Sequence, residues 1–96
     1  MGNYNGHVKA TRVATSTLAV SGAFSLLAVQ YSHSATGGVL NIIDGLTSSG
    51  ATVAVLNMHL AAGSGYVEFP GQGIEMGTGI YVDLGTGGIA ATVFYG

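Results

Sequence analysis

Residues 66–95 read YVEFPGQGIEMGTGIYVDLGTGGIAATVFY, and glycines divide this stretch into short alternating runs. Within IYVDL, residues 80–84, apolar side chains at every second position alternate with Tyr81 and Asp83. This period of two is typical of a half-buried antiparallel strand. The same reasoning predicts four strands here, over residues 66–69, 74–76, 80–84 and 89–95.

The upstream sequence continues this pattern. Residues 24–34, FSLLAVQYSHS, alternate in the same way, and VLNII at 39–43 ends at the tight-turn dipeptide Asp44-Gly45. The segment 8–20 is rich in Thr, Val and Ala and predicts one or two further strands. We therefore expect an all-β protein of seven or eight short strands, a small antiparallel β-sandwich or jelly-roll-like fold.

The domain organisation is predicted to be simple, because no linker, charged tail or internal repeat interrupts the chain. Residues 1–96 are expected to form a single β-sandwich domain. Residues 1–7 are either terminal disorder or an arm, because chain ends are mobile unless they are tied down.

The segment 51–60 has apolar side chains at both odd and even positions, which predicts a strand buried on both faces. Ala, Leu and Met are also good helix formers. A helix over ATVAVLNMHLAA, residues 51–62, therefore stays open as an alternative.

The chain has few charged side chains. Asp, Glu, Lys and Arg make up 6% of its 96 residues, against about 25% in an average soluble domain. A largely neutral surface suits an assembly better than a free monomer. Two cations cannot neutralise a run of phosphates, so nucleic acid is not an expected ligand. Because small domains bury a modest fraction of their surface and this one lacks Cys for disulfides, we expect oligomerisation or docking on a larger body.

No association with membranes is expected. The stretch 13–43 lacks charged residues and exceeds the roughly 20 residues of a spanning helix, but serines, glycines and His33 interrupt it. The same interruptions disfavour a signal peptide beginning at Lys9 and Arg12, as does a chain that still starts at Met1.

Metal and cofactor sites are not expected. The absence of Cys excludes thiolate ligands, and His7, His33 and His59 lie too far apart for a zinc motif with local spacing. The glycines at 71, 73 and 77 miss the dinucleotide fingerprint by one position and are predicted to be turn residues.

No catalytic residues are predicted, so the protein is not expected to be an enzyme. Glu68 and Glu75 could be imagined as an acid and base pair for glycoside cleavage, but nothing in the sequence fixes their separation. With Asp83, they are better interpreted as outward strand residues that keep the sheet soluble and discourage edge-to-edge pairing.

The five tyrosines are spread evenly over the chain, at positions 4, 31, 66, 81 and 95. Three roles stay open for them: core or cross-strand packing, contact between subunits, and a ligand groove.

Residues 69–96, FPGQGIEMGTGIYVDLGTGGIAATVFYG, resemble a pattern of small β-rich virion proteins of tailed bacteriophages. The matching pieces are Pro70-Gly71, residues 73–76, GIYVDL at 79–84, the glycine-rich hairpin after it and ATVFY at 91–95. Residues 39–45 and 53–60 fit the same layout. The resemblance implies a structural part of the particle and offers no catalytic residues.

These observations together predict a non-enzymatic virion protein, most simply a capsid decoration or cement protein that clamps capsomer junctions. Its expected partners are further copies of itself and a major capsid or other virion protein. The segments 8–20 and 51–60 are candidates for strand addition to neighbouring chains. A neck, tail or fibre component and a small secreted sugar-binding module remain the alternatives.

Overall fold

Nine strands and no helix make up the described part of the chain. The computed structural model describes residues 8–34, 38–57, 63–85 and 88–96. The strands are β1 (Lys9–Val13), β2 (Thr17–Ser21), β3 (Phe24–His33), β4 (Val39–Asp44), β5 (Ala51–Asn57), β6 (Gly63–Glu68), β7 (Ile74–Met76), β8 (Gly79–Leu84) and β9 (Ala90–Tyr95).

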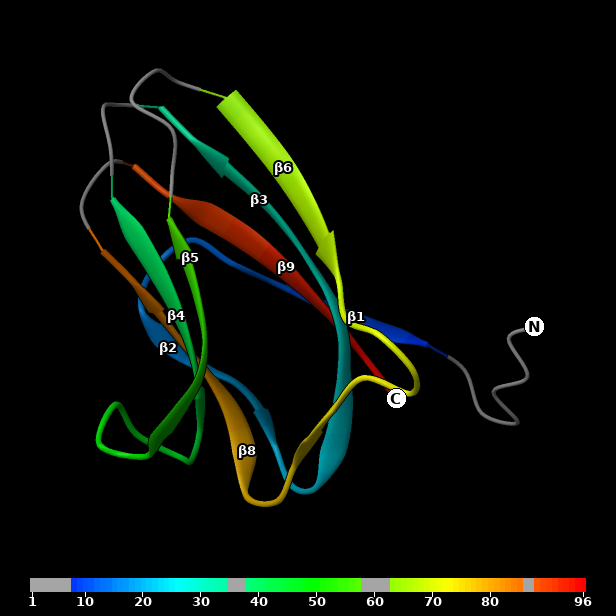
Figure 1. The fold of residues 1–96 in the computed structure, drawn as a ribbon. Coiled ribbons are helices and arrows are strands. Elements are labelled where there is room, and N and C mark those ends of the chain that lie inside the picture. The colour runs from blue at the N-terminus through cyan, green and yellow to red at the C-terminus, as the bar shows by residue number, and fades with distance from the viewer. Residues whose placement is uncertain (1–7, 35–37, 58–62, 86–87) are drawn as a thin grey trace.

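The strands form two antiparallel sheets that pack face to face (Figure 1). Sheet A has the order β1-β9-β3-β6, and the short strand β7 also pairs with β3. Sheet B has the order β2-β8-β4-β5. The predicted all-β sandwich is therefore confirmed. The count of nine exceeds the expected seven or eight by one, with segment 8–20 forming two strands, the upper end of the expected one or two.

Most connections carry the chain from one sheet to the other, so that β1, β3, β6 and β9 alternate with β2, β4, β5 and β8. The strands β4 and β5 instead form a hairpin within sheet B. Strands distant in sequence thus become neighbours: β1 lies beside β9, and β2 lies beside β8.

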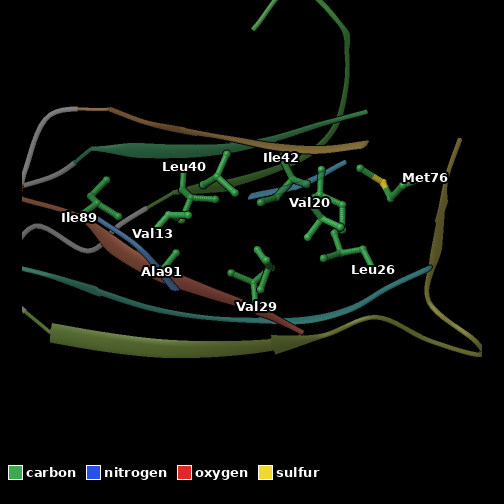
Figure 2. Packing of buried hydrophobic residues seen from close by; sticks show 12 residues of the cluster. Val13, Val20, Leu26, Val29, Leu40, Ile42, Met76, Ile89 and Ala91 are labelled. Carbon is green, nitrogen blue, oxygen red and sulfur yellow. The ribbon is translucent and has the colours of Figure 1, made fainter. Parts of the chain in front are cut away.

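The core lies between the two sheets and is made of aliphatic side chains and one methionine (Figure 2). Leu40 and Ile42 of β4 face Val29 of β3 and Ala91 of β9 across the interior. The alternation predicted for β8 and β9 is confirmed, since Val82 and Val93 are fully buried. Full burial of an aliphatic side chain of this size contributes about 1.5–3 kcal/mol, so this cluster is the main source of stability.

The prediction that residues 51–60 form a strand buried on both faces is wrong. The described part of this segment, β5, is an edge strand that pairs with β4 alone, and Val55 is 53% exposed. The helix alternative is also wrong for β5, whose backbone is extended. Residues 58–62 lie outside the described residues. The apolar side chains on the outer face of β5 are therefore exposed on an uncovered surface of sheet B, and they do not indicate a central strand.

The faces of β3 differ from the expected strict alternation. An irregularity in the pairing between β3 and β9 falls between Leu26 and Ala28. Leu26 and Val29 both belong to the core cluster, although strict alternation places them on opposite faces. An extra residue in one strand produces this shift. As a result, Leu27 and Ala28 both line the outer surface of sheet A.

None of the described residues belongs to a helix long and apolar enough to span a membrane.

Candidate interaction surface

The outer face of sheet A is set by the pairing of its strands. Val29 and Val93 are paired and point into the core, so their neighbours along each strand point outward. Ala28 therefore lies beside Phe94 on the outer face, with Glu68 on its other side. In the next outward row, Gln30 lies between Thr92 and Tyr66.

At one end of this face is a hollow with a volume of about 390 Å³. Three strands and the turn after β6 contribute to it. The hollow is lined by Val8, Leu27, Ala28, Tyr66, Glu68, Phe69, Pro70, Gly71 and Phe94. Apart from Glu68, every side chain in this set is uncharged, and most are apolar.

Two aromatic rings form the wall of the hollow. The centroids of Tyr66 and Phe94 are 6.4 Å apart and the rings meet edge to face at 66°. Tyr66 is 58% exposed, and Val8 at the rim is 49% exposed. Tyrosine offers a large apolar area with a polar tip, and aromatic residues are enriched in the buried centres of protein interfaces. The hollow thus has the composition of a contact surface.

The other end of the outer face of sheet A is polar. A second hollow of about 230 Å³ lies there. Its side chains are mostly hydroxyl and amide groups with one cation, and it is lined by Arg12, Gln30, Tyr31, Ser32, Ser64, Ala90, Ala91 and Thr92. The outer face therefore has two hollows, one with mainly apolar side chains in its lining and one with mainly hydrogen-bonding side chains.

The segments predicted as candidates for strand addition do lie at the edges of the sheets. Segment 8–20 contains β1, at an edge of sheet A, and β2, at an edge of sheet B. The described part of segment 51–60 is β5, at the other edge of sheet B. Neither β2 nor β5 has a charged residue. A strand with an uncharged, open edge can accept another strand through its backbone groups.

The histidines and tyrosines are placed as follows. His33 is buried in β3, while His7, His59 and Tyr4 lie outside the described residues. Tyr31 and Tyr95 pack against the core, and Tyr95 stacks edge to face on Phe24 at 5.2 Å.

Those two tyrosines therefore fit the packing role. Tyr66 faces solvent, and Tyr81 is half-buried on the outer face of sheet B, beside Ile43.

The acidic residues are separated on the two sheets. Glu68 and Glu75 are exposed on β6 and β7, as expected of outward strand residues. Asp83 is half-buried on β8 and accepts a hydrogen bond of 3.2 Å from the hydroxyl of Ser16. Within the described ranges, no three His, Asp or Glu side chains come together as metal ligands.

Asp44 has a structural role that the sequence did not reveal. Its carboxylate accepts hydrogen bonds from the backbone N–H groups of Thr78 at 2.9 Å and Gly77 at 3.0 Å, with a longer one from Gly79 at 3.5 Å. The dipeptide Asp44-Gly45 suggested a local turn, but the side chain fastens the end of β4 to the distant turn between β7 and β8. The hydrogen bonds from Thr78 and Gly77 lower the pKa of this carboxyl below its ordinary value of 3.8.

We expect Asp44 to make stability depend on pH. Because its pKa is lower in the folded protein, its stabilising contribution is complete above 3.8 and is lost as the pH falls through the folded pKa. Asp44→Asn should lower the melting temperature at about pH 7 and reduce the further loss on acidification to about pH 2. Thermal unfolding followed by circular dichroism measures both effects.

Glu75→Gln is the control for this pH experiment, because it removes an exposed carboxylate that accepts no hydrogen bond from the described residues. An Asp44→Asn variant as stable as the native protein at neutral pH would show that the carboxylate does not hold the turn.

Comparisons with models of protein families, with curated protein sequences and with solved structures gave no match for this chain.

The hollow contains residues that sequence reasoning did not bring together. Phe94 could be placed on the outer face from the alternation in β9, and Tyr66 was recognised as a candidate contact. Leu27 was expected to share a face with Val29, and only the irregularity in β3 places it in the hollow.

Proposed function

We propose that this protein is a non-enzymatic structural component of the virion of a tailed bacteriophage, a capsid decoration or cement protein. It binds across capsomer junctions on the outside of the head and stabilises the shell. Its partners are the major capsid protein and further copies of itself, and it reaches the virion from the host cytoplasm, where particles assemble. The observation that carries the proposal is the hollow on the outer face of sheet A, lined mainly by residues with apolar side chains, with Tyr66 exposed at its wall.

The small number of charges supports this role. A protein that fills seams must bury its own surface against another protein, and burying an ion costs several kcal/mol unless the ion is well paired. Four of the nine strands, β2, β3, β5 and β9, have no charged residue at all. In β6 the only charged residue is Glu68, at its end.

The order of the strands also supports a role in a particle. If β6 and β7 are counted as one interrupted strand, the two sheets have the orders 1-8-3-6 and 2-7-4-5. This order results when a long hairpin is rolled across two sheets, as in a jelly roll, and jelly rolls are common among capsid and lectin domains. The fold alone does not determine the function, so the strand order counts only together with the surface.

Repetition supplies the binding strength in this mechanism. A symmetric shell presents the same seam many times, and linked copies hold on more tightly than one contact does alone. A modest hollow is sufficient for a decoration protein, because many copies act together.

We expect Tyr66→Ala to weaken binding to the shell. An exposed aromatic residue at the wall of a hollow is a typical hot spot, and its truncation costs about 2 kcal/mol, or roughly 30-fold in affinity per copy. Co-sedimentation with particles that lack the protein measures the loss. Leu46→Ala is the control, since Leu46 is similarly exposed at 50% but lies in the connection after β4, outside the outer face of sheet A. Equal losses in the two variants would place the contact elsewhere.

The proposed function is tested by the number of copies in native particles. Particles are purified on a density gradient, and the chain is quantified by mass spectrometry against the major shell protein. A copy number comparable with that of the shell protein is expected. A number that fits a single ring would indicate the neck, tail or fibre, and absence from particles would contradict the virion role.

A sugar-binding module is the second candidate, and the same hollow favours it. Aromatic rings beside a carboxylate, here Tyr66, Phe94 and Glu68, could stack on a sugar ring and accept hydrogen bonds from its hydroxyl groups. Binding on a glycan array that disappears in Tyr66→Ala would support this candidate over the shell.

A further inference from the structure

The charged residues of sheet A are sorted by sign between its two edges. Lys9 and Arg12, the two cations of the whole chain, both lie on β1. Glu68 lies on β6 and Glu75 on β7, both beyond β3 at the opposite edge. No ion pair joins any of the four to another described residue. Each edge therefore presents charges of one sign to solvent.

Both edges are open for pairing. Among the described strands, β1 pairs with β9 alone and β6 pairs with β3 alone. Every pairing across sheet A is antiparallel, from β1 through β9 and β3 to β6. The strands β1 and β6 consequently run in opposite directions. A second copy in the same orientation could place its β1 beside β6 and continue the antiparallel sheet.

We propose that copies of this protein associate head to tail, with β6 of one copy paired with β1 of the next. This contact goes beyond the proposed function, since it forms between copies without a shell. It joins the edges of sheet A, beside the wall of the hollow that Tyr66 forms. A contact of this kind joins two different surfaces, so repetition produces a closed ring or an open filament.

The rows of outward side chains give a register for the contact. One row runs from Arg12 through Thr92 and Gln30 to Tyr66. The next outward row begins at Ala10 and ends at Glu68. If these rows continue into the next copy, its Arg12 lies opposite Tyr66 and diagonal to Glu68.

Tyr66 and Glu68 both stabilise the guanidinium of Arg12 at this position. Side chains directly opposite or diagonal across strands interact, and opposite charges stabilise the pairing. An Arg over the face of a Tyr ring adds a cation–π attraction.

The charges also disfavour the competing symmetric contacts. Two β1 edges would bring Arg12 and Lys9 of both copies together, and two β6 edges would bring their Glu68 side chains together. Like charges across strands are destabilising. Charged side chains at edges are a common protection against aggregation, and here they oppose like edges while favouring unlike ones.

Sheet B does not oppose this arrangement. The edge strands β1 and β2 contact each other, so they lie on the same side of the sandwich, and the strand orders place β6 and β5 on the other side. The head-to-tail contact therefore brings β5 of one copy toward β2 of the next. Neither strand has a charged residue that would be buried without a partner.

Charge reversal at each edge tests the proposal on the purified full chain by sedimentation velocity over a range of concentrations. The native protein is expected to form oligomers that weaken with added salt, because exposed charge pairs are screened. In the expected register, Arg12→Glu places a carboxylate diagonal to Glu68 of the next copy, and Glu68→Arg places a guanidinium diagonal to Arg12 of the next copy. Each variant alone should remain monomeric.

An equimolar mixture of the two variants is the decisive sample. In the mixture, Glu68 of the Arg12→Glu variant meets Arg12 of the Glu68→Arg variant, and the two substituted side chains form the reversed pair. Oligomers should therefore return, which a folding defect could not produce. A native protein that stays monomeric, or a mixture that does not associate, would overturn the proposal. Particle binding is measured separately, so failure here leaves the proposed function to its own test.

Discussion

Replacing Gly73 by Ala is expected to destabilise the protein by roughly 2 to 6 kcal/mol. Gly73 has a φ of +89°, where side chains other than glycine are strained. A Cβ at this position would also overlap the backbone carbonyl oxygen of Leu26, which cannot move without disturbing β3. Gly73 ends this turn, and its backbone N–H donates a hydrogen bond of 3.2 Å to the carbonyl oxygen of Pro70. The substitution therefore strains the turn and pushes β7 away from β3.

Gly71→Ala is the matched control for this prediction. Gly71 lies in the same turn and also has a positive φ, of +64°, but a Cβ there would meet nothing within 4 Å. We expect a loss of about 1 to 2 kcal/mol, from the backbone conformation alone. Urea unfolding followed by fluorescence or circular dichroism gives the free energy of unfolding for both. Equal losses would show that the carbonyl of Leu26 imposes no additional constraint.

These two glycines show where sequence reasoning ended. The sequence indicated that the glycines at 71, 73 and 77 belong to turns between short strands, and the structure places all three there. It could not show which of them approaches another strand, because the carbonyl of Leu26 lies more than forty positions away along the chain. Local patterns identify a turn, and only the fold identifies its closest neighbour.

The faces of β8 and β9 could be predicted, because the deciding pattern lies within each strand. Each has one apolar and one mixed face, and a period of two assigns the apolar face to the core. In β5 both faces are apolar, so the period carries no information about burial. Whether such a strand lies at the centre or the edge depends on its lateral neighbours, and β5 has only β4.

The candidate contact surface could be predicted only in part. Tyr66 and Phe94 follow from alternation within their own strands. Their meeting at 6.4 Å depends on β6 and β9 both lying beside β3, and Leu27 joins them through the irregularity in that strand. Likewise, the sequence showed four acidic and two basic residues, but the order of the strands decides that opposite signs lie at opposite edges of sheet A.

Leu40→Ala is expected to cost about 2 to 5 kcal/mol, the range for truncation of a fully buried leucine. Leu40 is fully buried in β4, where it pairs with Leu56 of β5 and Leu84 of β8 (Figure 2). Removing the isopropyl group beyond its Cβ leaves a cavity beneath sheet B that the paired backbones on both sides cannot collapse to fill. Because a domain of this size is stable by only about 5 to 15 kcal/mol, the melting temperature should fall by about 10 to 30 °C.

The chain offers the same chemical change at an exposed site. Leu46, in the connection after β4, is 50% exposed, so Leu46→Ala should cost less than about 1 kcal/mol. Differential scanning calorimetry of both variants separates burial from the loss of side-chain atoms as such. If Leu40→Ala were as mild as Leu46→Ala, the two sheets would not depend on the cluster between them for their stability. A large difference would instead show that packing of the inner face stabilises sheet B. The edges and the outer surface of the sheet would then be free for contacts with other chains.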